Sequence, residues 1–124
     1  MVNYSFDIKG RHAEVIDLLK PLYEYKPHDF KQMCTASRVC VATSDSAVVG
    51  FGRAITDGVM QTAIYDVIVA DKYKKMGIGR NIVDLLCMQC NARVTILYAE
   101  PGSEDFYINI GFSNLRNGMF RRGC

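Results

Sequence analysis

The sequence lacks any long run of apolar residues. Its longest apolar stretches, such as residues 67–70 and 94–98, are far shorter than the roughly 20 residues that a membrane-spanning helix needs. The N-terminus has neither a basic start nor an apolar core, so it does not resemble a secretory signal peptide. We therefore expect a cytoplasmic protein that has no membrane partner.

The chain also carries little net charge. Its 15 Lys and Arg residues stand against 13 Asp and Glu residues, which gives a formal charge of +2. A nucleic-acid-binding protein needs a concentrated basic face that neutralises phosphates, so we expect no nucleic-acid partner. The positive charge gathers locally at Lys72, Lys74, Lys75 and Arg80, and a nucleic-acid-binding role would depend on that cluster alone.

The five cysteines, at positions 34, 40, 87, 90 and 124, are an odd number in a chain without an export signal. This favours free thiols in a reducing compartment. Cys87 and Cys90 form a C-x-x-C motif, but no second such motif or pair of histidines completes a zinc site. The motif also lies late in a helical pattern, not at the helix start where a thiolate is stabilised. We expect these cysteines to pack a helix, and we expect no metal.

The length and composition fit one folded domain over residues 1–124. Hydrophobic residues make up 49% and charged residues 23% of the chain, which disfavours wholesale disorder. A chain of 124 residues buries roughly two-thirds of its unfolded surface, so it can fold without disulfides.

Hydrophobic periodicity predicts the element order β-α-α-β-β-β-α-β-α-β, an α/β fold that some conventions call α+β. The expected ranges are a strand at 3–9, helices at 12–23 and 30–34, strands at 38–43, 47–56 and 61–70, a helix at 77–90, a strand at 94–99, a helix at 104–110 and a terminal strand or hairpin at 112–122. Pro21 can kink or end the first helix, and Asp29 can cap the second.

The three middle strands should form an antiparallel meander, because short turn signals separate them. The strand at 94–99 is apolar, so we expect it to be buried on both faces and paired in parallel. Together these elements predict a mixed sheet, mostly antiparallel, that is flanked by helices.

One strand runs through a glycine-containing loop into a helix, at residues 67–80. Free backbone N–H groups at a helix start attract anions, and glycines allow a phosphate to approach the backbone closely. Lys74, Lys75 and Arg80 add positive charge there. The segment is therefore a candidate pyrophosphate site, although an ordinary loop before a helix is an equally weighted alternative.

Two common phosphate-binding motifs do not fit this segment. A Walker A loop needs G-x-x-x-x-G-K-[ST], which the chain does not contain. A dinucleotide-binding fingerprint needs a third glycine or alanine where this sequence has Val83, and it belongs early in a βαβ unit.

Two motifs resemble the GCN5-related N-acetyltransferase (GNAT) superfamily. Residues 74–79 read Lys-Lys-Met-Gly-Ile-Gly, close to the family's acetyl-CoA motif [Q/R]-x-x-G-x-[G/A], with Lys in place of Gln or Arg. Residues 106–112 read Phe-Tyr-Ile-Asn-Ile-Gly-Phe, as in the signature F-Y-x-x-x-G-F of the family's last helix. The motifs occur in the family's order, and the resemblance covers about residues 48–120.

The resemblance implies a GNAT fold with acetyl-CoA as co-substrate. In the family, the fourth strand separates from the fifth, and the pantetheine arm lies between them. Backbone groups of the fourth strand would bind that arm and the acetyl carbonyl, and the loop would hold the pyrophosphate. The cofactor-binding residues implied are Val67, Ile68, Val69, Lys74, Lys75, Met76, Gly77, Ile78, Gly79 and Arg80.

Two residues are candidates for catalysis, one from the resemblance and one from its position in the predicted fourth strand. Tyr107 matches the usual general acid of the family, which protonates the departing CoA thiolate, and a phenol has a suitable pKa of about 10. Asp66 is the carboxylate embedded in the fourth strand, where it could accept a proton from the amine. Its alternative role is structural, as an acid hydrogen-bonded to a neighbouring loop. Tyr23, Tyr25, Phe30 and Met33 could line an acceptor pocket, although core packing is the favoured alternative for most of them.

We predict an acetyl-CoA-dependent N-acetyltransferase that moves an acetyl group to a primary amine of a small molecule by direct attack in a ternary complex. A protein or peptide amine is the alternative acceptor. A non-catalytic module that binds CoA or acyl-CoA with the same fold is the alternative function. The last strand is short in this sequence, so a second subunit could complete it in a homodimer.

Overall fold

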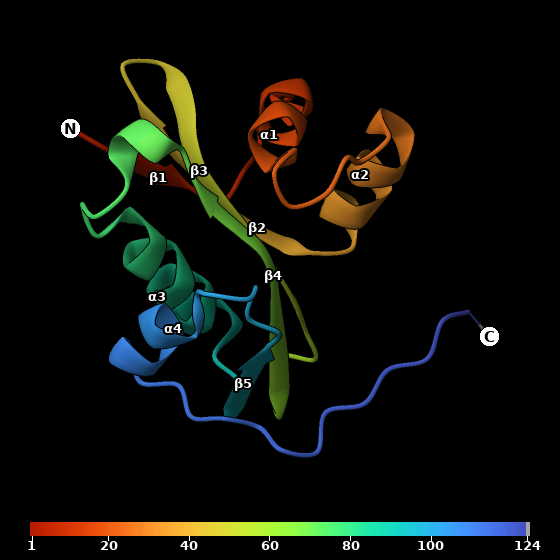
Figure 1. Ribbon diagram of the computed structural model, residues 1–124. Helices are drawn as coiled ribbons and strands as arrows, with labels where there is room; N and C mark the ends of the chain where they lie inside the picture. The colour runs from red at the N-terminus through yellow and green to blue at the C-terminus, as the bar shows by residue number, and fades with distance from the viewer. Residues whose placement is uncertain (124) are drawn as a thin grey trace.

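A single five-stranded sheet organises the protein, and its strand order is β1-β2-β3-β4-β5 (Figure 1). The computed structural model describes residues 1–123. The strands are β1 (Asn3–Ser5), β2 (Arg38–Ser44), β3 (Ala47–Thr56), β4 (Gln61–Val69) and β5 (Val94–Leu97). The helices are α1 (His12–Leu19), α2 (Pro27–Thr35), the short 3₁₀ helix η1 (Asp71–Tyr73), α3 (Ile78–Cys90) and α4 (Glu104–Asn109). The fold is a mixed α/β arrangement, as predicted.

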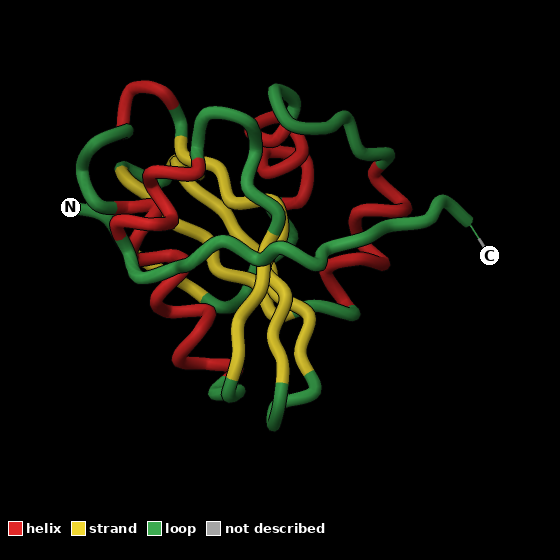
Figure 2. Tube along the Cα trace, turned by 60° about the horizontal axis from the view of Figure 1, so that its bottom comes forward, coloured by secondary structure: helices red, strands yellow, loops and turns green. Residues whose placement is uncertain are grey.

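The strand pairing agrees with the predicted meander. Strands β1 to β4 pair antiparallel in sequence order, whereas β5 pairs in parallel with β4. Figure 2 shows the strands fanning out from the middle of the sheet, with helices on both sides. No helix within residues 1–123 is long and apolar enough to cross a membrane.

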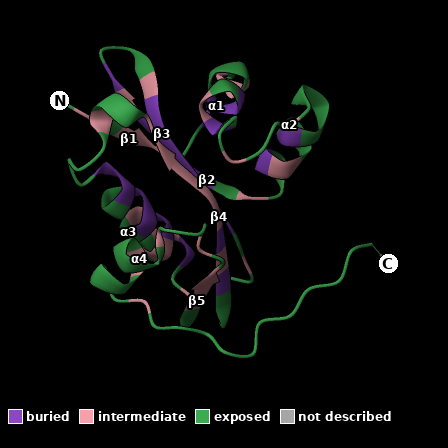
Figure 3. Ribbon diagram, viewed as in Figure 1, coloured by how far each residue is buried: buried purple, intermediate pink, exposed green. Residues whose placement is uncertain are grey.

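Alternation of side chains along β2 and β3 sends buried residues to both faces of the sheet. On one face, Val41 and Phe51 pack against α1 and α2 through Leu19 and Phe30. On the other face, residues such as Cys40 and Ala54 pack against α3. Figure 3 shows buried residues on β2, β3 and parts of the helices that cover them. The sheet is therefore the middle layer of three.

Glycines allow α3 to lie close to the middle of the sheet. A Cβ atom on Gly52 would lie 2.7 Å from Cγ2 of Ile82, and one on Gly50 would lie 2.9 Å from Cδ1 of the same side chain. Real Cβ contacts are essentially never that short. The two glycines of β3 thus make room for the helix whose first turn belongs to the candidate phosphate site.

Several predicted element boundaries need correction. The first strand ends at Ser5, not Lys9, and α1 ends at Leu19, before Pro21, instead of reaching Tyr23. Asp29 does not cap α2, because Pro27 already occupies the first helical turn and Lys26 is the N-cap residue.

Two predictions about the C-terminal part were wrong. The strand β5 is not buried on both faces: it has four residues at the edge of the sheet, and Val94 is 48% exposed. No strand or hairpin forms at 112–122 within the described part of the chain. The apolar residues of that segment do not alternate, and Leu115, Met119 and Phe120 are exposed, so the segment has no buried face to hold it in a sheet.

Candidate active site

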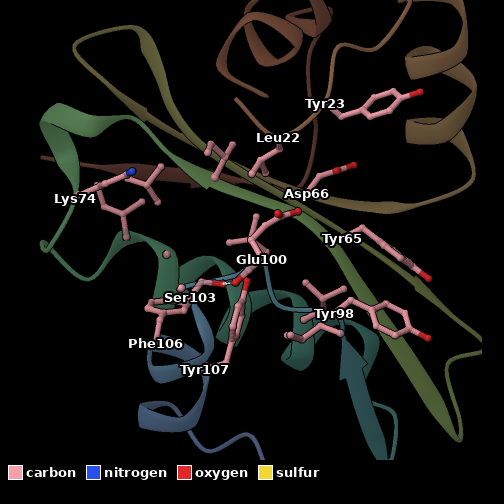
Figure 4. Close-up of a pocket in the computed structure, with 18 of the residues that line it drawn as sticks. Leu22, Tyr23, Tyr65, Asp66, Lys74, Tyr98, Glu100, Ser103, Phe106 and Tyr107 are labelled. Carbon is pink, nitrogen blue, oxygen red and sulfur yellow. Dashed lines mark hydrogen bonds between the residues drawn. The ribbon is translucent and has the colours of Figure 1, made fainter. Parts of the chain in front are cut away.

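A cavity of about 840 Å³ runs along β4, from the α1–α2 loop to the starts of α3 and α4 (Figure 4). It brings together most of the residues that the sequence singles out. These are Asp66, Val67, Ile68, Val69, Lys74, Lys75, Gly77, Ile78, Gly79 and Tyr107. Met76 and Arg80 are the two predicted site residues that do not line it.

The cavity exists because β4 and β5 pair over only part of their length. Their register runs from Gln61 opposite Val94 to Ile64 opposite Leu97, and the second half of β4 continues with β3 alone. The chain then leaves β5 toward α4, so the two strands enclose an opening. Backbone N–H and C=O groups of β4 that would bond a neighbouring strand are left to bind something else there.

A β-bulge occurs at this point of β4. Asp66 and Val67 together face Gly52, since Phe51 pairs with Ile68 and Arg53 pairs with Tyr65. Asp66 has a positive φ of 58°, which is uncommon for a residue other than glycine. The extra residue re-aims the side chain of Asp66 toward the face that α1 and α2 cover, where Tyr25 donates to it.

The Asp66 carboxylate is held by two partners. Tyr25 donates its hydroxyl to both carboxylate oxygens at 2.8 and 2.9 Å, and Nε of Arg53 donates to Oδ2 at 2.7 Å. The side chains of Arg53 and Asp66 are only 10% and 12% exposed. Burial and the hydrogen bond to Asp66 raise the pKa of Tyr25 to about 12, so its hydroxyl stays protonated. The Asp66 carboxylate therefore already has a buried counter-charge in Arg53 and a hydrogen-bond donor in Tyr25.

The loop before α3 has the backbone geometry of an anion site. Gly77 precedes the helix with a φ of 83°, and Lys75 has a φ of 63°. The first N–H groups of a helix have no acceptor within the helix, and α3 is long enough at 13 residues to have a substantial dipole. A Cβ on Gly79 would meet Cζ of Phe106 at 3.2 Å, so this glycine also lets α4 approach the loop.

The cations of this loop do not all face the cavity. Lys74 lies on the cavity wall and forms an ion pair with Asp71 at 2.9 Å. Lys75 lines the cavity as well. Arg80 is paired at 3.6 Å with Asp84, one helical turn later, which explains its place outside the lining. These lysines and the start of α3 form what we call the cationic end of the cavity.

Tyr107 projects from α4 into the cavity. Its ring packs edge-on against Phe106 and Phe112, with ring centroids 4.9 and 5.7 Å away. Burial raises the pKa of Tyr107, and the negative charge of Glu100 raises it further. The phenol is therefore protonated at neutral pH, which is the form that can donate a proton.

Several residues of this site were not predicted from the sequence. Six of the seven tyrosines line the cavity, namely Tyr23, Tyr25, Tyr65, Tyr73, Tyr98 and Tyr107. Tyr107 was predicted from its motif, and Tyr23 and Tyr25 as possible pocket residues, whereas Phe30 is buried in the core and Met33 does not line this cavity. The residues missed are Tyr65, Tyr73, Tyr98 and Glu100, which share no motif, so only the fold brings them together. Their signal in the sequence was position: Tyr65 precedes Asp66, and Tyr98 follows β5.

The cysteines lie away from the cavity lining. Cys34, Cys40, Cys87 and Cys90 are free thiols, and Cys124 is outside the described residues. Cys90 is buried in the core, and Cys87 packs beside it with Sγ 3.6 Å from Oγ1 of Thr95, as expected for helix packing. Among residues 1–123, no group of three or more His, Cys, Asp or Glu side chains could hold a metal ion.

Comparison with known proteins agrees with this geometry. Residues 17–124 match the model of the acetyltransferase (GNAT) domain family. An uncharacterized N-acetyltransferase of Pyropia yezoensis is 31% identical over 79 residues, which are 61% of this chain and 45% of that protein. A chloroplastic serotonin N-acetyltransferase of Oryza sativa is 32% identical over 75 residues, 58% of this chain and 38% of that protein. The chain thus spans less than half the length of these curated relatives.

Solved structures share the whole fold. A protein of unknown function from meticillin-resistant Staphylococcus aureus superimposes with a TM-score of 0.87 at 18% identity, over 99% of this chain and 100% of that one. A glucosamine-6-phosphate N-acetyltransferase from Arabidopsis thaliana gives a TM-score of 0.78 at 17% identity, over 98% and 97% of the two chains. At such identities the likeness concerns the fold alone.

Proposed function

We propose, because this chain belongs to the GNAT acetyltransferase family, that it transfers an acetyl group from acetyl-CoA to a primary amine of a small molecule. One observation carries the proposal: a single cavity joins the cationic end, the free backbone of β4 and the phenol of Tyr107. A bound thioester would need these three groups in that order, from its pyrophosphate through its pantetheine arm to its sulfur atom.

The cationic end supplies what a pyrophosphate requires. The N-terminal N–H groups of α3 and the ammonium groups of Lys74 and Lys75 favour bound anions. Gly77, with its positive φ, places the backbone at the anion without a side chain in between. Val67, Ile68 and Val69 would then pair with the pantetheine amides, in the manner of an added strand.

The reaction we propose is direct attack within a ternary complex. The amine nitrogen attacks the acetyl carbonyl, whose developing oxyanion is stabilised by a β4 backbone N–H group. Collapse breaks the carbon–sulfur bond, and Tyr107 protonates the departing thiolate. None of the four cysteines within residues 1–123 lies in the cavity lining, so these four do not support a covalent thioester intermediate on the protein.

Asp66 has a different role in this proposal from the one predicted. Asp66 lines the cavity, but its carboxylate is already engaged by the ion pair with Arg53 and the hydrogen bond from Tyr25. We therefore assign Asp66 to positioning: it fixes the β-bulge from which the free backbone of β4 begins. This matches the structural alternative considered for Asp66.

A small molecule is the acceptor we favour over a protein amine. The cavity is lined on several sides, by β4, the α1–α2 loop and the segment after β5, which suits a compact ligand. The rice relative is named for serotonin, which is a small amine. Acetylation of a peptide amine, or binding of CoA without turnover, would instead support the alternatives.

The cationic end can be tested by charge reversal. We expect the double substitution Lys74→Glu and Lys75→Glu to raise the KM for acetyl-CoA about tenfold or more, because two charge-assisted contacts to phosphate would be lost. The matched control is Lys20→Glu with Lys31→Glu, the same charge change at exposed positions outside the cavity lining. An unchanged KM in the first variant, measured by release of free CoA, would contradict this assignment.

Three further expectations remain predictions. We propose that residues 1–124 act as one domain, that the protein is cytoplasmic, and that a homodimer forms through the C-terminal segment. Size-exclusion chromatography with light scattering measures the last of these directly.

A further inference from the structure

The cavity beside β4 has a second end that acetyl-CoA does not account for. Opposite the cationic end, Figure 4 shows the rings of Tyr23, Tyr65 and Tyr98 on the far side of the cavity from Lys74. We call these three residues the tyrosine end. Tyr23 and Tyr98 are 62% and 63% exposed, so their rings are not used to fill the core.

Exposed rings at the mouth of a cavity are suited to hold another ring. Aromatic pairs are stabilised beyond simple burial when they stack or meet edge to face. The rings of the tyrosine end come from the α1–α2 loop, from β4 and from the residue after β5. A flat ligand can therefore meet rings from separate parts of the chain.

Two carboxylates line the cavity, and only one of them is available to a ligand. The charge of Asp66 is balanced by the ion pair with Arg53, and its oxygens accept the hydroxyl of Tyr25. Glu100 is exposed. Among residues 1–123, its carboxylate has no ion pair and no hydrogen-bond partner, while its backbone carbonyl accepts a hydrogen bond from Ser103. In Figure 4 it points into the cavity between Asp66 above and Tyr107 below.

Glu100 also lies within electrostatic reach of the reacting end of the site. Its negative charge contributes, after burial, to the raised pKa of the Tyr107 phenol. A cation bound at Glu100 would thus lie close to the group that we assign to protonate the thiolate. This is the place where the nitrogen of an acceptor has to be.

We infer that Glu100 binds the ammonium group of the acceptor and removes its proton, and that the acceptor is a primary amine carried on an aromatic ring held by the tyrosine end. The inference rests on the proposed acetyl transfer and adds to it the base and the substrate class.

The proton balance of this step is complete. Glu100 takes one proton from the bound ammonium, and the neutral nitrogen forms the new bond to the acetyl carbon. The carbon–sulfur bond breaks, and the thiolate receives the proton of Tyr107. The second proton of the attacking nitrogen leaves to water as the amide forms, and Glu100 and Tyr107 return to their starting forms by exchange with solvent.

The charges of the lining disfavour other classes of acceptor. The cationic side chains of the lining, Lys74 and Lys75, lie at the cationic end, and Arg53 beside the Tyr65 ring is already paired with Asp66. Within this lining, a phosphorylated or carboxylated acceptor would therefore find no free cation at the tyrosine end. A polyamine would place several cations where Glu100 offers one free carboxylate. An acceptor with one ammonium group and an apolar ring matches the single free carboxylate and brings no negative charge to the tyrosine end.

A pair of matched acceptors tests the role of Glu100. 2-Phenylethylamine is an ammonium ion at neutral pH, whereas O-benzylhydroxylamine has nearly the same shape and is uncharged there. We expect Glu100→Gln to lower kcat/KM for 2-phenylethylamine about 100-fold, the usual range for a lost base, and for O-benzylhydroxylamine about threefold or less. Glu100→Asp should recover part of the activity, and Asp105→Asn, an exposed acid outside the lining, should leave both values unchanged.

A second pair of acceptors tests the tyrosine end. We expect wild-type protein to prefer 2-phenylethylamine over n-hexylamine by about tenfold in kcat/KM, and Tyr98→Leu, which keeps apolar bulk but removes the ring, to reduce that preference to about twofold. The exposed aromatic residue Phe120 provides the control, because Phe120→Leu should not change the ratio.

The outcomes separate this inference from the proposed function. If Glu100→Gln affects both members of the first pair equally, or if wild-type protein acetylates aliphatic amines or peptides in preference to 2-phenylethylamine, the inference is overturned while acetyl transfer stands. If no amine in the set is acetylated although acetyl-CoA binds, both are overturned. Loss of activity in Asp66→Asn with a selective effect on the charged amine would move the base to Asp66.

Discussion

At the scale of single residues, the most consequential group is the buried ion pair between Arg53 and Asp66. It joins β3 to the bulge of β4, and Tyr25 ties it to the α1–α2 loop. Arg53 also donates to Ser37 at 3.3 Å and lies 4.9 Å from the centre of the Tyr65 ring. Four segments of the chain therefore depend on one pair of charges.

Removing one partner of this pair should destabilise the protein strongly. We expect Asp66→Ala to lower the free energy of unfolding by about 3–5 kcal/mol, because Arg53 would remain buried without a counter-charge. The matched control is Asp17→Ala, which breaks the exposed ion pair with Lys20 and should cost less than about 1 kcal/mol. Urea unfolding followed by circular dichroism gives both values, and equal midpoints for the two variants would refute the assignment.

The cysteines allow a second test at the same scale. Burial raises the pKa of Cys34 to about 11 and that of Cys40 to about 12, so both thiols are protonated at pH 8. Because only the thiolate reacts quickly, we expect iodoacetamide to leave both residues unmodified in folded protein and to label them after unfolding in urea. Peptide mapping by mass spectrometry reads each position separately, and rapid labelling of Cys40 in the folded protein would contradict its burial.

At the scale of elements, the site depends on how β3, β4 and α3 fit together. The bulge in β4 faces Gly52, and the same glycine gives α3 its room. The pairing of β4 with β5 ends at Ile64, two residues before the bulge, and the cavity lies along the rest of β4. A change at Gly52 should therefore affect both the stability of the core and the opening of the site.

We expect Gly52→Ala to lower the free energy of unfolding by about 1–3 kcal/mol, the usual cost of overpacking, because its Cβ would lie 2.7 Å from Ile82. Gly118→Ala is the control, since its Cβ would meet Tyr98 at an ordinary 3.5 Å. Thermal unfolding compares the two variants. A Gly52→Ala protein as stable as the wild type would mean that α3 does not lie as close to the sheet as described.

Much of the fold could be predicted from the sequence, because most elements carry strong local signals. Strand β3 was predicted with its observed bounds, and α3 began within one residue of its observed start. The prediction of a strand or hairpin at 112–122 was wrong because Asn117 and Gly118 favour a turn locally, whereas the residues around them have no buried face to hold them in a sheet. Local propensity alone could not reveal that these residues stay exposed.

The residues of the site likewise fall into those that could be predicted from the sequence and those that could not. The loop at residues 74–79 and Tyr107 belong to motifs with fixed spacing, so they could be located in the sequence. The roles of Glu100 and Tyr98 depend on where β5 ends and where the cavity lies, which is tertiary information. Asp66 could be singled out by sequence, but its partner Arg53 lies on another strand, and that pairing changes the role we assign to it.

At the scale of the whole molecule, each of the three layers contributes a different part of the proposed site. The sheet provides the backbone of β4, and α3 with its loop provides the cationic end. The α1–α2 loop, β4 and the segment after β5 provide the tyrosine end, and α4 brings Tyr107 between the two ends. Acetyl-CoA and the amine would therefore enter from opposite ends of one cavity and meet at Tyr107 and Glu100.

The kcat of Tyr107→Phe, measured by formation of the N-acetylated amine from saturating acetyl-CoA, tests this account most directly. The substitution removes one oxygen atom and keeps the ring packing against Phe112. We expect kcat to fall about 100-fold or more while the KM for acetyl-CoA changes little, as for a lost general acid. A variant with wild-type kcat would contradict the account, because acetyl transfer would then not depend on the group at which both ends of the cavity meet.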